Sequence, residues 1–172
     1  MRMFRAVAVI AISASMCVGG FAPGVVQASS TQNITPPTGA VNWGSSVFVL
    51  HNGNFVVTNP AYNVPVANTG AVYLYDGATR NLISRLTGSS GLDQVGSSGI
   101  VELNNGNFVV LSPNWSDGVS AKVGAVTWVN GSTGLSAAVS ATNSIVGSHP
   151  DDQVGNGLRV TPLTNGNYVV SS

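Results

Sequence analysis

The chain has 172 residues, of which 44% are hydrophobic and only 7% are charged, with six basic and six acidic side chains. Lysine and arginine form no cluster in the sequence, so a surface suited to the phosphates of a nucleic acid is not expected. Recurrent valine, leucine, isoleucine and aromatic residues exclude an intrinsically disordered chain.

The first 28 residues have the pattern of a secretory signal peptide. Arg2 and Arg5 precede an uncharged, mostly apolar run, and Val26 and Ala28 are small residues at the positions that a signal peptidase reads. Cleavage is therefore expected after Ala28, which makes the protein secreted or displayed at the cell surface. A membrane anchor is the weaker alternative, because the run is short, holds serines and glycines and lacks a charged stop.

The single cysteine, Cys17, lies inside this segment, and Met16 stands where a lipoprotein anchor would need a small residue. The mature chain would therefore have no cysteine, and packing and backbone pairing must hold it together without a disulfide. Its four basic and six acidic side chains leave a formal charge of −2. Residues 29–40 are expected to form a linker before the first repeat.

Three motifs recur along the rest of the chain. NGN, followed by an aromatic residue and two valines, begins at Asn52, Asn105 and Asn165, at intervals of 53 and 60 residues. GAVYLYDG at 70–77 returns as GAVTWVNG at 124–131, and DQVG occurs at 93–96 and 152–155. Because repeats at such periods indicate one structural unit each, the chain divides into units at 41–94, 95–153 and 154–172, the last of them partial.

Each full unit predicts four β-strands. The apolar runs of the first unit lie at 45–50, 55–60, 70–75 and 81–87, and those of the second unit lie at 99–103, 107–112, 124–129 and 134–140. Asn52-Gly53 between the first two runs predicts a two-residue type I′ hairpin turn, in which both central residues have a positive φ. Pro60 should end the second strand, because proline cannot donate a ladder hydrogen bond.

The second strand of each full unit carries three consecutive apolar residues, Phe55–Val57 and Phe108–Val110. Unbroken runs mark a strand that is covered on both faces, whereas alternation would mark a sheet with one wet face. These features predict an all-β, propeller-like fold of two full four-stranded blades and a partial third in an incomplete ring. A β-sandwich built from a duplicated motif and a β-solenoid are the alternatives.

The order of Gly96-Ser97-Ser98, then NFVVLSP, then GAVTW resembles the FG-GAP repeat of integrin α-chain propellers. NGNFVVLSPNW, VGAVTWVNGSTG and NSIVGSHPDDQVGNG resemble more closely an uncharacterised repeat of bacterial secreted and surface proteins, often large adhesin-like chains. This resemblance covers residues 41–172 and implies an extracellular, adhesive or structural protein without catalytic residues. The calcium of integrin-type blades is not implied, because LHNGNF and LNNGNF carry no carboxylate at that place.

The sequence contains no arrangement that predicts catalysis. GSSG has the wrong spacing for a nucleophile elbow, and His51 flanks a turn where the second unit has Asn104. His149, Asp151 and Asp152 are close in sequence, but two or three ligands do not complete a calcium shell. The aspartates are expected to cap a turn instead. Catalytic residues, a metal and a cofactor are therefore not predicted.

Three aromatic side chains are the candidate ligand-binding residues: Tyr62, Trp115 and Trp128. They could stack on a sugar ring, as in propeller lectins, although periodic aromatic residues more often fill the seam between blades. The predicted function is adhesion, protein interaction or scaffolding, with an unknown extracellular protein or glycan as the partner. The alternative is a small carbohydrate-binding lectin that is completed by oligomerisation.

Two blades and part of a third cannot close a ring, for which about four are usual. Their open faces predict a piece of a longer repeat array, several chains assembled into one homo-oligomeric ring, or aggregation through open edges. The break falls inside a unit rather than between units, which favours the longer array.

Overall fold

The computed structural model describes residues 33–157 and 159–171. The predicted signal peptide, residues 1–28, lies outside these residues together with Cys17. All the regular elements in the described ranges are β-strands, which confirms the predicted all-β class. Among the same residues, the chain forms no helix of the length and hydropathy needed to cross a membrane.

The first unit forms a sheet whose strands follow the order of the chain. Its strands are β1 (Ser46–Val49), β2 (Phe55–Asn59), β3 (Ala71–Tyr75) and β4 (Leu82–Thr87), each antiparallel to the next. We call this set of strands blade 1. β2 ends immediately before Pro60, as predicted, and all five of its residues are buried.

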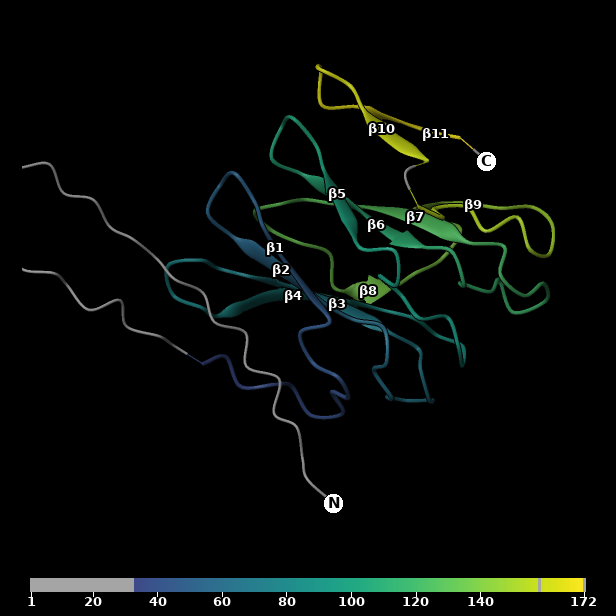
Figure 1. Ribbon diagram of the computed structural model, residues 1–172, viewed down its shortest axis with the longest axis horizontal. Coiled ribbons are helices and arrows are strands. Elements are labelled where there is room, and N and C mark those ends of the chain that lie inside the picture. The colour runs from purple at the N-terminus through teal and green to yellow at the C-terminus, as the bar shows by residue number, and fades with distance from the viewer. Residues whose placement is uncertain (1–32, 158, 172) are drawn as a thin grey trace, which may run out of the picture.

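The second unit forms a sheet of β5 (Ile100–Glu102), β6 (Phe108–Ser112), β7 (Ala125–Val129) and β9 (Ser144–Val146), which we call blade 2. β6 is buried along its whole length, so the prediction of a strand covered on both faces is confirmed in both blades. The third unit contributes a hairpin of β10 (Val160–Pro162) and β11 (Tyr168–Val170). Figure 1 shows the three sheets one after another in chain order, none of them closed into a barrel.

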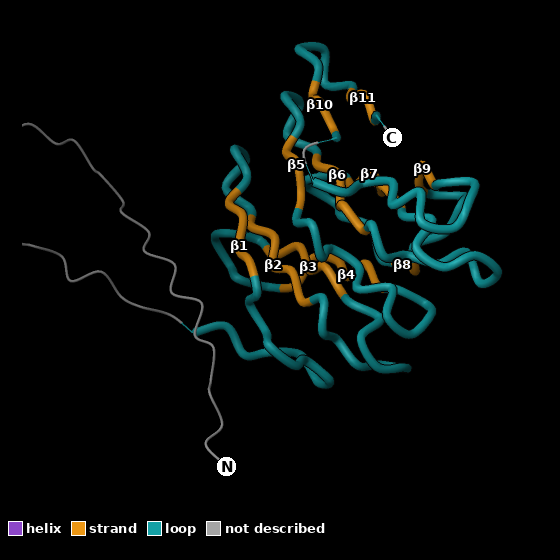
Figure 2. The backbone as a smooth tube through the Cα atoms, turned by 45° about the vertical axis from the view of Figure 1, so that its right-hand side comes forward, coloured by secondary structure: helices purple, strands orange, loops and turns teal. Residues whose placement is uncertain are grey.

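The prediction for the fourth strand of the second unit is wrong. Of residues 134–140 only Ala137–Ala138 form a strand, β8, and it pairs in parallel with β4 of blade 1. Figure 2 shows β8 beside the first sheet. The reason is packing between the sheets, because Val139 is buried in their shared core and donates its N–H to the carbonyl of Thr87. The fourth place in blade 2 is taken by β9, where Ile145 pairs with Val126.

The NGN hairpins also differ from the predicted type I′ turn. His51, Asn52 and Gly53 form a three-residue loop, in which the N–H of Gly53 donates to Leu50 at 2.9 Å. Within this loop Gly53 alone has a positive φ, 87°. The loop is therefore a type I turn followed by a left-handed glycine. The Asn52 side chain favours it, because its Oδ1 accepts the N–H of Asn54 at 3.0 Å. The two later copies of the motif repeat these bonds.

Alternate residues of the buried strands point into different cores. Val56 of blade 1 lies in one cluster with Phe108 and Val110 of blade 2. Phe55 and Val57 face the opposite side, which is covered by residues that precede β1. The covering residues are Ile34, Ala40 and Trp43.

A third cluster joins blade 2 to the β10–β11 hairpin. Val109 and Leu111 of β6 lie there with Val160, Tyr168 and Val170 of the third unit. Blade 2 therefore uses one face to pack on the unit before it and the other face to pack on the unit after it. This arrangement agrees with the predicted incomplete, propeller-like stack.

Candidate functional site

Two of the three candidate aromatic residues are buried between or beneath units. Tyr62 is 2% exposed and Trp115 is 4% exposed. The hydroxyl of Tyr62 accepts a hydrogen bond from Nη1 of Arg85 at 3.1 Å, and the guanidinium lies 5.7 Å from the centre of the ring. Trp115 belongs to the core between the two blades. Neither ring presents an open face to a sugar in this structure.

Trp128 is the candidate that stays accessible, with 42% of its surface exposed. It lies on β7, opposite Val109 of β6, and so on the side of blade 2 that faces the third unit. Tyr62 lies on the face of blade 1 that points away from blade 2, which we call the first face, and Trp115 lies between the blades. The three candidates thus occupy three different layers and do not form one site.

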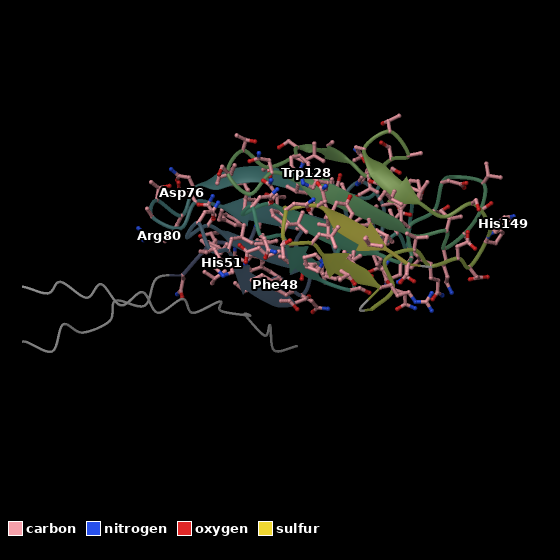
Figure 3. The ribbon with its side chains drawn as sticks, turned by 90° about the horizontal axis from the view of Figure 1, so that it is seen from above. Phe48, His51, Asp76, Arg80, Trp128 and His149 are labelled. Carbon is pink, nitrogen blue, oxygen red and sulfur yellow. The ribbon has the colours of Figure 1, made fainter. Side chains whose placement is uncertain are left out.

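The two histidines lie at opposite ends of the molecule, as Figure 3 shows. Nδ1 of His51 is 2.8 Å from Oε2 of Glu102, whose Oε1 accepts the N–H of His51 at 2.7 Å. Glu102 therefore ties the first hairpin loop of blade 1 to β5 of blade 2. His149 belongs to a turn of the second unit, where its Nδ1 lies 2.9 Å from Oγ of Ser148.

Asp93 of the first DQVG motif links two consecutive units. The residue is fully buried, and its Oδ2 accepts the N–H groups of Ser89 and Ser90 at 2.9 and 2.8 Å. Its Oδ1 accepts the N–H of Ser116, which belongs to the following unit, at 3.1 Å. Burial raises the pKa of Asp93, because these bonds do not fully offset the loss of hydration.

Asp152 of the second DQVG motif caps a turn, as expected. Its Oδ2 accepts the N–H groups of His149 and Ser148, both at 2.8 Å. These two bonds hold the pKa of the Asp152 carboxyl below its ordinary value. In the described ranges, groups of three or more histidine, cysteine or acidic side chains placed to hold a metal ion do not occur.

The asparagines of the NGN motif bind backbone groups rather than presenting a polar site. Oδ1 of Asn54 accepts the N–H of Gly77 at 3.3 Å, and Oδ1 of Asn107 accepts the N–H of Gly131 at 3.1 Å. Asn52 and Asn54 of blade 1 both donate from Nδ2 to the carbonyl of Gly131 in the second unit, at 2.9 Å. The first two copies of the motif therefore join a hairpin to its own blade. Both also reach the next unit, since Nδ2 of Asn105 donates to the carbonyl of Gly166 at 3.3 Å.

An apolar surface of blade 2 is uncovered on the side of the third unit. Trp128 and Ile145 lie there, 42% and 48% exposed, and we call this surface the open face. Their counterparts in blade 1 are Leu74, which pairs with Val56, and Leu86 of β4. These leucines are 1% and 2% exposed, because the second unit covers them.

Sequence reasoning selected Trp128 as a candidate ligand-binding residue and did not select Ile145. A signal was present in the longer interval between the second and third NGN motifs, 60 residues instead of 53. The extra length lies partly between β7 and its fourth-strand partner, since Val72 pairs with Leu86 whereas Val126 pairs with Ile145.

The comparison with protein families agrees with this architecture. A family described as a repeat of unknown function (DUF5650) matches residues 49–97, 102–156 and 162–172. These stretches contain most of blade 1, most of blade 2 and most of the β10–β11 hairpin. The curated proteins contain no match to the chain. Since the matched residues make up more than half of its length, the chain belongs to the DUF5650 family of repeats of unknown function.

Proposed function

We propose that the chain is an exported repeat module of bacterial secreted or surface proteins, which acts in adhesion, protein interaction or scaffolding and not in catalysis. The export pattern of residues 1–28 and the resemblance to adhesin-like repeats support this function. The observation that carries it is the open face. Positions that hold a neighbouring unit in blade 1 are presented to solvent in blade 2, and exposed apolar surface of this kind is typical of interaction sites.

The polar residues of the repeat motifs support the same function. Asp93 and Asp152 bind turn backbones, and Asn54 and Asn107 bind the glycines of neighbouring turns. Their side chains are thus used to fix the blades. An interaction module needs rigid, repeated surfaces, and these bonds supply the rigidity.

Export and binding can be tested on the full chain, expressed in a bacterial host with its own N-terminal segment. We expect the protein outside the cytoplasm, shortened by residues 1–28 in its measured mass. The purified protein is then passed over immobilised extracellular matrix proteins and over itself, and binding is followed by surface plasmon resonance. Retention of the unprocessed chain in the cytoplasm, or an absence of binding to every surface, would contradict the proposal.

A lectin is the second candidate, and the exposed indole of Trp128 favours it. A glycan array with the purified chain tests this function. Trp128→Ala should abolish binding of any glycan found, whereas Trp128→Tyr should retain it, because stacking needs an aromatic face. A glycan that binds the alanine variant as well as the parent, or an array without a hit, excludes the lectin.

A further inference from the structure

We propose that the open face of blade 2 and the free edge of β11 together form a docking surface for the third strand and following hairpin of a further repeat unit of this family. The inference rests on the proposed function, because it names the kind of partner that the module holds. The occupant is an extended segment of this repeat family, with small and apolar residues, and not a glycan.

The edge of β11 offers backbone groups for an added strand. Ser171 donates its N–H to Arg159 at 2.9 Å, so alternate residues from Ser171 backwards bond with β10. The N–H and C=O groups of Tyr168 and Val170 therefore point to the other edge. In the part of the chain that the structure describes, that edge pairs with no strand, whereas β2 and β6 pair there with β3 and β7.

The interface between the blades shows what fits such a surface. Leu74 and Leu86 of blade 1 share a core with the segment 123–139 of the second unit. Gly134 of this segment lies so close to Ser84 and Leu74 that a β-carbon would overlap the Ser84 side chain. β8 of the same segment pairs with β4. The apolar residues that it contributes to this core are Val123, Ala125, Val129, Leu135 and Val139.

The polar contacts of the two DQVG motifs differ in the same way. Asp93 binds its own turn and also the N–H of Ser116 in the unit that follows. The hydrogen bonds of Asp152 in the described residues come from Ser148 and His149 of its own turn. Both of these bonds go to Oδ2, so in the described residues the second motif lacks the bond to a following unit that Oδ1 of Asp93 makes.

The geometry selects a segment rather than a whole blade. β10 and β11 already lie against β6 of blade 2, where Val160 and Tyr168 pack in one cluster with Val109 and Leu111. Trp128 of β7 and Ile145 of β9 lie outside this contact and stay exposed. A strand added to β11 would gain main-chain hydrogen bonds, and alternate side chains would cover Trp128 and Ile145.

A peptide with the sequence of residues 123–140 tests the proposal. The fluorescein-labelled peptide is titrated with the full chain, and binding is followed by fluorescence anisotropy. Asp at Ala125 and Val129 of the peptide should abolish binding, because these side chains face the covered blade. Asp at Val126 and Trp128 of the peptide, which point to the opposite side of the strand, should leave binding intact. Equal binding of both altered peptides would overturn the proposal.

Variants of the protein supply the second arm. Ile145→Asp should weaken peptide binding at least tenfold, because it charges the open face. Val119→Asp, in a loop where the residue is 94% exposed, should leave binding unchanged. Binding that is lost in both variants or in neither contradicts the docking surface. If the peptide fails to bind while extracellular proteins still do, this inference falls and the proposed function stands.

An intramolecular version covers the case in which the peptide aggregates. Residues 113–140 are appended after Ser172, which preserves the spacing of the repeat because Ser172 corresponds to Ser112. The fusion should raise the Tm by about 4 °C or more relative to the same fusion with Asp at the copied positions of Ala125 and Val129. Equal Tm values for the two fusions would refute the inference.

Discussion

Replacing Leu86 by alanine should destabilise the chain far more than replacing Ile145, although both residues hold the same place in their blades. Leu86 pairs with Val72, and Ile145 pairs with Val126. Leu86 is 2% exposed, so its truncation removes buried methyl groups and leaves a cavity in the core, at a cost of about 2–5 kcal/mol. Ile145 is 48% exposed, so its truncation should cost only about 1 kcal/mol, half the burial term of a large aliphatic side chain.

Urea unfolding followed by tryptophan fluorescence measures both losses. With a slope of about 2 kcal/mol per molar urea, a loss of ~3 kcal/mol moves the midpoint for Leu86→Ala down by about 1.5 M. The midpoint for Ile145→Ala should move by about 0.5 M. Equal shifts would refute the reasoning, because they would mean that the open face of blade 2 is covered in solution as fully as the matching face of blade 1.

Three further predictions concern the turns. Gly77→Ala should lower the free energy of unfolding by about 2 kcal/mol in a thermal melt, because a β-carbon would overlap the carbonyl of Gly53. Gly91→Ala is the control and should be neutral, since its β-carbon would meet one backbone oxygen at 3.6 Å. Asp93→Ala should cost ~3 kcal/mol, about 1 for each of its backbone N–H partners, and Asp152→Ala should cost less; equal losses in urea would contradict the role of burial. Unfolding over a pH series should separate the two carboxyls. Because burial raises the pKa of Asp93, the parent should gain stability relative to Asp93→Asn as the pH falls through that raised value towards 3.8. The pKa of Asp152 is lowered by backbone N–H groups, so the parent should lose stability relative to Asp152→Asn as the pH falls below 3.8, and profiles of the same sign would be inconsistent with these shifts.

The stacked strands could be predicted from the sequence because their residues allow few alternatives. Phe55–Val57 and Phe108–Val110 leave no polar position for a wet face, and Pro60 stops the ladder where β2 ends. These signals are local, so the strands can be predicted without knowing which residues pack on them.

The strand pairing of residues 134–140 could not be predicted from the sequence in the same way. Ala137, Ala138 and Val139 are apolar without alternation, so the pattern does not tell a strand of their own blade from one that joins the neighbouring blade. The decision is made by the burial of Val139 against blade 1, which is a tertiary contact. Because the fourth strand of the second unit was expected at residues 134–140, Ile145 of β9 was not recognised as a residue of that strand.

The candidate site depended even more on contacts between units. Trp115 and Trp128 are both aromatic residues of the second unit, and composition gives no reason to separate them. Trp115 is buried because blade 1 lies against it. Trp128 is exposed because the described part of the third unit packs on β6 and leaves Trp128 of β7 uncovered. Exposure of this kind is a property of the stack and not of the residue.

The first face of blade 1 is covered by aromatic side chains of the first unit and by residues that precede β1, so the two outer faces of the stack differ. Where the second unit has Val95 and Thr127, the first unit has the larger Trp43 and Tyr73. The rings of Trp43 and Tyr73 meet edge to face at 4.9 Å, and both residues are buried together with Tyr75. Aromatic side chains and the residues ahead of β1 thus fill the place that a preceding blade would take.

In the described residues the face of blade 1 that points away from blade 2 is covered, so a further unit can pack only on the side of blade 2. Contacts between unlike surfaces generate open filaments when each added molecule again presents both surfaces. Here the surface complementary to the open face is covered by Ile34, Ala40 and Trp43, as in the terminal caps of other repeat proteins. Identical chains in contact through the open face should therefore not extend into a fibre.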